Sequence, residues 1–158
     1  MTFLMSSIKC SFMFYGEYAH TIDRKGRVIL PAKFRQAVKA RGLNKFYVTR
    51  GLDKCLFVFT EEEWKAQEDK FKALSFTSEV SRKFNRLFFS GAQETMLDSQ
   101  GRMLVPQYLK DFAELKKEIV IIGVSNRIEI WSKELWKEFY ESSRPSFEEN
   151  AEKIVGQQ

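Results

Sequence analysis

The chain contains 158 residues, of which 44% are hydrophobic and 15% aromatic, so it can bury one sizeable core or two very small ones. Two distant cysteines, Cys10 and Cys55, exclude a disulfide scaffold and a zinc ribbon, and a single histidine, His20, excludes a His-based metal cluster or a Ser-His-Asp triad within one chain. The net charge of +5 is too small to identify a partner by itself.

Several sequence patterns are missing. No apolar run approaches the roughly 20 residues that span a bilayer, and residues 1–15 lack the basic segment and cleavage site of a secretory signal. No glycine-rich phosphate loop or dinucleotide fingerprint occurs. We therefore expect a cytoplasmic protein with no membrane partner, no cofactor, no bound metal and no enzymatic activity.

The first half of the chain predicts two strand pairs around a short helix. The first pair should form a hairpin, because an Asp-Arg-Lys-Gly turn separates two short apolar runs. The helix should begin at Pro31 and end before Gly42, since proline is favoured in the first helical turn and glycine after the last. The expected strands are 18–22, 28–30, 45–49 and 56–59.

Two helices are expected in the middle of the chain. Thr60 and Glu63 form a capping box for a helix through about Leu74, and a second helix should follow Ser78. The second half then repeats the plan of the first, with strands at 95–97, 103–105, 119–122 and 128–131 and a last helix capped by Ser132. Residues 146–158 lose this pattern and predict a frayed tail.

The repeat is clearest in a motif, D-x-x-G-R-x-x-x-P, that occurs twice. In each copy the aspartate opens a turn, the glycine closes it with a positive φ, and the proline opens a helix. One unit alone has too little apolar area for a stable fold, so two units should complete one core. The motif residues are Asp23, Gly26, Arg27 and Pro31 in the first copy and Asp98, Gly101, Arg102 and Pro106 in the second.

The two copies differ in charge. Residues 20–54 contain ten basic and two acidic residues, a net charge of +8, whereas residues 94–127 contain five of each. A basic patch confined to one copy favours a polyanionic partner, and nucleic acid is the simplest candidate.

The duplicated motif resembles the MraZ family of bacterial transcription regulators, whose chains carry two tandem SpoVT-AbrB-type domains. The resemblance covers roughly residues 13–141, and the family's usual start fits Met13-Phe14-Tyr15-Gly16. It implies a β-rich α+β fold, in which tandem swapped-hairpin AbrB-like units form a double-split β-barrel pseudo-dimer with peripheral helices. The expected divisions are an N-terminal extension (1–12), domain 1 (17–63), a helical connector (64–91), domain 2 (92–135) and a C-terminal helix and tail (136–158).

Arg27 and Arg102 are the first candidates for function. Each follows a turn, from which an arginine could reach a phosphate or a guanine edge. Each could equally form an ion pair with the aspartate of its own turn, Asp23 or Asp98, and so serve structure. The family resemblance implies that the motif takes part in DNA binding, which favours the functional interpretation for Arg27.

Other basic residues of the first copy extend this candidate site. Arg24 and Lys25 occupy the turn tip, where charge could bind a groove or simply be solvated. Lys33 and Arg35 lie on the helix after Pro31, where they could meet flanking phosphates or merely face solvent. The predicted DNA-binding residues are therefore Arg24, Lys25, Arg27, Lys33, Arg35 and Arg102.

The resemblance implies a sequence-specific regulator that binds double-stranded promoter DNA at repeated short boxes. The expected target is the division and cell-wall gene cluster, including the protein's own gene, and the protein would associate with the nucleoid. A ring-shaped homo-oligomer would suit repeated boxes, with apolar contacts expected from Phe88, Phe89, Trp136 and Tyr140. The alternatives are an oligomeric scaffold or antitoxin-like protein-binding module without DNA specificity, and then an RNA-binding protein.

Overall fold

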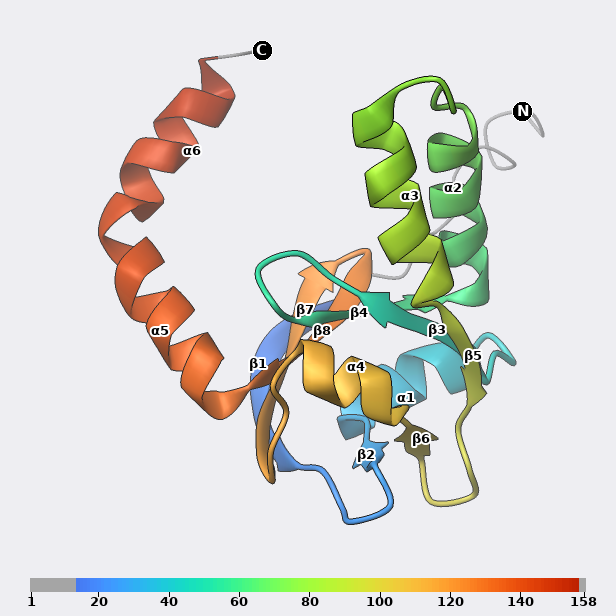
Figure 1. Ribbon diagram of the computed structural model, residues 1–158. Coiled ribbons are helices and arrows are strands. Elements are labelled where there is room, and N and C mark those ends of the chain that lie inside the picture. The colour runs from blue at the N-terminus through green and yellow to red at the C-terminus, as the bar shows by residue number, and fades with distance from the viewer. Residues whose placement is uncertain (1–13, 157–158) are drawn as a thin grey trace, which may run out of the picture.

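A computed structural model describes residues 14–156, which form a β-rich α+β fold with two antiparallel sheets and several helices (Figure 1). The strands are β1 (Phe14–Thr21), β2 (Arg27–Ile29), β3 (Lys45–Arg50), β4 (Leu56–Thr60), β5 (Gln93–Met96), β6 (Arg102–Leu104), β7 (Glu118–Ser125) and β8 (Arg127–Ser132). The helices are α1 (Ala32–Lys39), α2 (Glu61–Lys72), α3 (Glu79–Ser90), α4 (Gln107–Phe112), α5 (Lys133–Ser143), the 3₁₀ turn η1 (Arg144–Ser146) and α6 (Phe147–Val155).

The two sequence copies exchange strands. The six-stranded sheet has the order β1-β7-β8-β4-β3-β5, so the first strand of each copy pairs with the other copy. Strands β2 and β6 pair with each other in a separate two-stranded sheet, with Val28 opposite Met103. Each copy therefore depends on the other for the partners of its first two strands.

This pairing corrects two expectations. The predicted hairpins do not form extended strand pairs. The two sides of the first turn are joined by the isolated bridge between Ile22 and Val28, and β2 pairs along its length with β6. No closed barrel forms among residues 14–156, because β1 and β5 are the two edges of the large sheet and the three-residue strands β2 and β6 pair outside it.

The expectation of one shared core is confirmed. The main buried cluster takes equivalent residues from both copies, for example Val28 with Met103 and Phe34 with Leu109, all of them almost completely buried. Burial of such side chains supplies about 1.5–3 kcal/mol each. The core therefore holds the two turns, which carry the repeated motif, in a fixed relation to each other.

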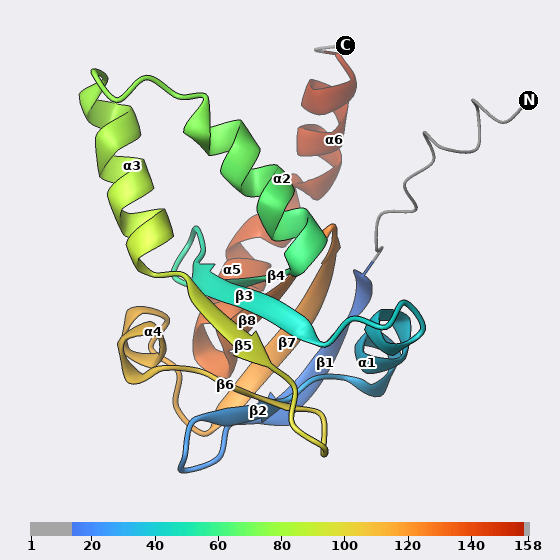
Figure 2. The same ribbon diagram turned by 90° about the vertical axis from the view of Figure 1, so that its right-hand side faces the viewer.

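The predicted helix starts are confirmed where a side chain caps the helix. The hydroxyl oxygens of Thr60, Ser78 and Ser132 accept hydrogen bonds from the backbone N–H three residues later, at the starts of α2, α3 and α5. Helices α2 and α3 form a V-shaped pair above the sheet (Figure 2), and their bases pack on an aromatic cluster that includes Trp64 and Phe88. Phe88 is only 5% exposed, so the expectation that it offers an exposed contact is wrong.

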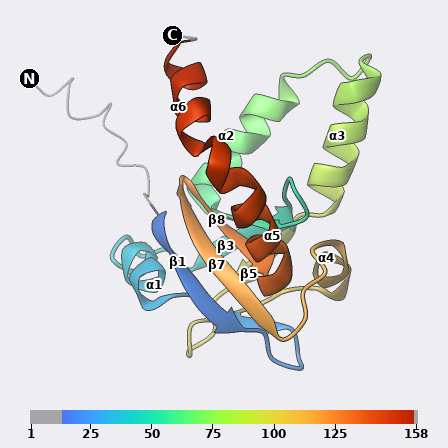
Figure 3. The ribbon, with the colours of Figure 1, turned by 90° about the vertical axis from the view of Figure 1, so that its left-hand side faces the viewer.

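The C-terminal segment also differs from the prediction. Instead of a frayed tail, residues 144–155 continue α5 through η1 into α6, which extends away from the sheets (Figure 3). The sequence signal is Phe147, Ala151 and Ile154 at helical spacing, with Glu148 and Glu149 in the first turn, where acidic groups favour a helix.

Among the described residues, none of the helices has the length and apolar character needed to cross a bilayer.

Candidate nucleic-acid interface

The two motif turns have the same geometry and lie at the same end of the molecule (Figure 1). The N–H of Gly26 donates to the Asp23 carbonyl at 3.0 Å, and the N–H of Gly101 donates to the Asp98 carbonyl at 2.9 Å. Both glycines have positive φ, +79° and +76°, which the sequence predicted. At Gly26 a Cβ would also come within 2.8 Å of the Val105 carbonyl, so this position excludes a side chain on two grounds.

Each aspartate holds the arginine of its own turn. Arg27 Nε donates to Asp23 Oδ2 at 2.7 Å and its backbone N–H donates to Oδ1 at 2.9 Å, and Arg102 repeats both contacts on Asp98. The backbone hydrogen bond is the main reason why the pKa of each aspartate is lowered. The cross-turn ion pair considered for these arginines is therefore present in both copies.

The ion pair leaves part of each guanidinium available. Among residues 14–156, the terminal nitrogens of Arg27 and Arg102 have no hydrogen-bond partner, and the two side chains are 30% and 23% exposed. A guanidinium held through Nε still carries four N–H donors on these two nitrogens, which suit a phosphate or a guanine edge. Structural pairing and ligand binding by the same arginine are thus compatible.

A basic residue from the opposite copy packs on each turn. Arg35 of α1 donates from Nε to the Leu30 carbonyl at 2.9 Å and covers Gly101, where an added Cβ would lie 2.9 Å from its Nη1. Lys110 of α4 covers Gly26, with its Cδ 3.7 Å from the position of an added Cβ. The two residues are equivalent, since each follows its motif proline by four positions.

This exchange places one basic residue of the opposite copy on each turn and leaves the first turn the more basic of the two. The first turn carries Arg24, Lys25 and Arg27 and gains Lys110, while the second carries Arg102 and gains Arg35. Arg24 and Lys25 are exposed at the tip of the first turn, and Lys33 is exposed on α1. Sequence reasoning missed Lys110, although its position four residues after Pro106 matches that of Arg35 after Pro31.

Each turn is also tied to the opposite copy through its backbone. The N–H of Leu30 donates to the Gly101 carbonyl at 3.2 Å, and the N–H of Val105 donates to the Gly26 carbonyl at 2.8 Å. The two turns therefore form one rigid surface, which we call the turn face: Arg24, Lys25, Arg27, Lys33, Arg35, Arg102 and Lys110.

The titratable groups outside the turn face do not form a metal site in the described part of the chain. No group of three His, Cys, Asp or Glu side chains with metal-binding geometry occurs there. Burial lowers the pKa of His20, and the positive charge of Arg35 lowers it further. Burial is also the main cause of the raised pKa of Cys55, so the thiol is not activated as a nucleophile.

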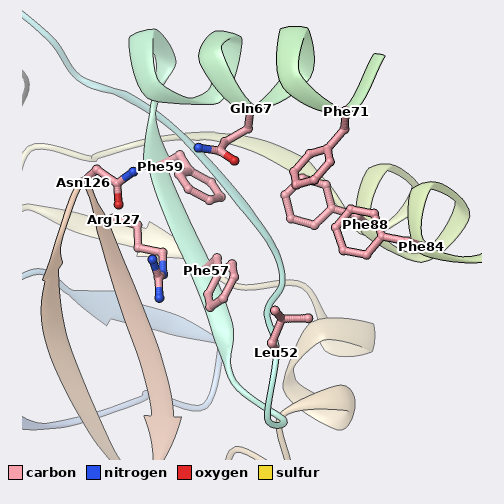
Figure 4. Close-up of a pocket in the computed structure, with 9 residues that line it drawn as sticks. All are labelled: Leu52, Phe57, Phe59, Gln67, Phe71, Phe84, Phe88, Asn126 and Arg127. Atoms are coloured by element: carbon pink, nitrogen blue, oxygen red, sulfur yellow. The ribbon is translucent and has the colours of Figure 1, made fainter. Parts of the chain in front are cut away.

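A small cavity of about 90 Å³ lies between α2, α3 and the central strands (Figure 4). Its lining is mostly aromatic, and the Arg127 guanidinium lies 4.6 Å above the Phe57 ring while its Nε donates to Glu129 at 2.9 Å. Trp131 Nε1 also donates to Glu129, so this buried carboxylate has partners at both oxygens. Arg127, the one charged residue of the lining, is thus already paired with a carboxylate, and the rest of the lining is mostly apolar.

Comparison with known proteins identifies the family. The family model described as "MraZ protein, putative antitoxin-like" matches the chain twice, over residues 13–87 and 88–158. This chain belongs to the MraZ family. The curated protein "Transcriptional regulator MraZ" of Carboxydothermus hydrogenoformans is 53% identical over 143 residues, which cover 90% of this chain and 97% of that protein. The family resemblance drawn from the duplicated motif is thereby confirmed.

Proposed function

We propose that the chain is a transcription regulator that binds double-stranded DNA through the turn face. The observation that carries the proposal is the presentation of several cations on two rigid, equivalent turns, with Arg27 and Arg102 oriented by their aspartates. Cations on a rigid scaffold suit DNA binding, because they contact phosphates or base edges without ordering a flexible segment first. The printed name of the 53% identical relative supports transcription as the process that is regulated.

The proposed DNA targets are repeated short boxes in the promoter of the division and cell-wall gene cluster that includes the protein's own gene. One chain offers two turns, too few contacts for tight binding alone. A ring-shaped homo-oligomer would present several turn faces to adjacent boxes and gain affinity through multivalency. In the cell such a protein would be associated with the nucleoid.

Fluorescence anisotropy with labelled DNA from upstream of the protein's own gene tests this function. We expect saturable binding that weakens steeply with salt and exceeds binding to shuffled DNA of the same length. Single-stranded RNA should compete poorly. Equal affinity for target and shuffled DNA would contradict sequence-specific regulation.

A second candidate is an antitoxin-like or scaffold protein in which the motif arginines serve structure alone. The ion pairs in both turns and the wording of the family description favour it. An assembled protein that fails to bind any DNA in the anisotropy assay would support this candidate.

A further inference from the structure

Helix α6 carries an apolar stripe that residues 14–156 leave uncovered. Phe147, Ile154 and Val155 are 74%, 63% and 69% exposed, and with Ala151 they recur at i, i+4, i+7 and i+8 on one side of the helix. Helix α6 continues from α5 through η1 and has no buried residue, so packing within the chain contributes little to its stability. An uncovered stripe on such a helix is suited to a partner surface.

Acidic residues border this stripe. Helix α6 contains Glu148, Glu149 and Glu152 against Lys153, a net charge of −2. Glu149 pairs with Lys153 at 3.2 Å, whereas Glu148 and Glu152 form no ion pair within the described residues. Two α6 helices from different copies would bring these unpaired carboxylates together, which disfavours α6 as its own partner.

Helix α3 has the complementary surface. Val80 and Leu87 are 78% and 61% exposed and lie two turns apart on its outer side, and Phe76 just before the helix is 81% exposed. The helix contains Arg82, Lys83 and Arg86 against Glu79, a net charge of +2. Lys83 pairs with Glu79 on the exposed surface at 2.9 Å, and Arg86 has no ion-pair partner among residues 14–156, so α3 offers apolar and basic groups together.

The two helices lie on different sides of one end of the molecule, opposite the turn face (Figure 1). A contact between α6 of one chain and α3 of another joins two different surfaces and is heterologous when it is made once per pair of chains, because the first chain then retains an unused α3 and the second an unused α6. Repetition of such a contact builds a closed ring or an open filament and leaves the turn faces of all chains exposed.

We propose that α6 of one chain docks on the outer face of α3 of a second copy, with its apolar stripe against Val80 and Leu87 and with Glu148 and Glu152 near Lys83 and Arg86. The proposal rests on the homo-oligomer of the proposed function and names the surfaces that join it. Both helices combine exposed apolar groups with net charge, and the two charges have opposite signs.

Light scattering on the full chain, with substitutions in each helix, tests the contact. Ile154→Glu should reduce the mass in solution from that of the wild-type oligomer to that of a single chain. Leu104→Glu is the matched control: Leu104 is 54% exposed on β6, at the end with the turns, and its substitution should leave the mass unchanged. An unchanged mass for Ile154→Glu would overturn the proposal, as would a monomeric wild type.

Charge reversal distinguishes the possible partners. Reversal of the α6 charges, with Glu148→Lys and Glu152→Lys, should dissociate the oligomer. Reversal of the α3 charges, with Lys83→Glu and Arg86→Glu, should do the same. A variant with all four substitutions should assemble again. A control variant combines the two α6 substitutions with Lys116→Glu and Lys117→Glu, at exposed positions outside both helices, so that its net charge equals that of the wild type. This variant should remain dissociated. Rescue by this control combination, or stronger assembly of the α6 pair alone, would contradict docking on α3.

The DNA assay separates failure of this contact from failure of the proposed function. A dissociated variant with an intact turn face should still bind a single DNA box weakly. It should lose only the additional affinity that several linked turn faces give for repeated boxes. A wild type that assembles through α6 and α3 but binds no promoter DNA would refute the proposed function and leave the contact standing.

Discussion

At the scale of single residues, the Asp-Arg pair of each turn stabilises the turn, and its arginine is the proposed DNA contact. The aspartate orients its arginine through Nε and accepts the arginine's backbone N–H through its other oxygen. Loss of the arginine side chain removes the first contact but leaves the second. The turn should therefore survive a change that removes the cation.

Arg27→Ala should abolish most DNA binding while the fold and the assembly remain intact. The lost cation is rigidly held, and the Asp23 backbone contact persists in the variant. If the arginine contacts a phosphate, the slope of log K against log salt should fall by about 1. Arg24→Ala, at the exposed tip of the same turn, should weaken DNA binding less than Arg27→Ala. Wild-type affinity in Arg27→Ala would refute the role.

Lys110→Ala should weaken DNA binding although Lys110 belongs to the copy with no net charge. Its side chain covers Gly26 and thus lies beside the most basic turn. We expect the salt slope to fall by about 1, as for one lost phosphate contact. Lys117→Ala, at an exposed position outside the turn face, should have no effect, and equal losses in the two variants would indicate that only overall charge matters.

The lowered pKa values of Asp23 and Asp98 predict how the turns respond to acid. A carboxyl whose folded pKa lies below its ordinary value of 3.8 stabilises the fold above that value, and the contribution is lost as the pH falls through the lower folded pKa. Wild type should thus have a higher melting temperature than Asp98→Asn at pH 7 and pH 5, and the difference should shrink below about pH 4. A difference that grows on acidification would contradict this assignment.

At the scale of elements, local signals identified the helices and turns but not the strand partners. The caps at Thr60, Ser78 and Ser132 depend on neighbouring residues and could be predicted. Strands β2 and β6 have three residues each, which is too few for their sequences to specify a partner. They pair with each other because Val28 and Met103 are buried together in the shared core. The position of Lys110 beside the first turn was missed for the same reason, because it follows from contact between the copies.

Gly26→Ala should destabilise the protein by more than Gly42→Ala. Both glycines have positive φ, so both substitutions cost roughly 1 kcal/mol in backbone strain. Only at Gly26 does the new Cβ meet a carbonyl oxygen at 2.8 Å, whereas nothing lies within 4 Å at Gly42. Denaturant unfolding measures the difference, and equal losses would show that the turn can relax away from Val105.

At the scale of the whole molecule, neither sequence copy is a separate folding unit. Strands β1 and β5 each lie in the half of the sheet built by the other copy. A fragment of residues 13–87 keeps β1, β2, β3 and β4 but lacks their partners β7, β6, β5 and β8. The copies are two parts of one interleaved structure.

We expect the fragment 13–87 to be unfolded as a monomer, or to fold only as a symmetric dimer in which a second fragment replaces the missing copy. Circular dichroism at increasing concentration, combined with light scattering, distinguishes these outcomes from independent folding. A folded monomer with native strand content at low micromolar concentration would contradict the mutual dependence.

The strand exchange also bears on how the two halves could diverge. In a dimer of identical chains, every change in one turn appears in the other, and partner chains must find each other at cellular concentration. Fusion of the two copies into one polypeptide removes both constraints, since the partner is always present and each turn mutates alone. The chain can thus keep a turn with three cations of its own, Arg24, Lys25 and Arg27, next to a turn with one, Arg102. In the proposed complex with DNA, these two turns would make unequal contacts in a fixed order.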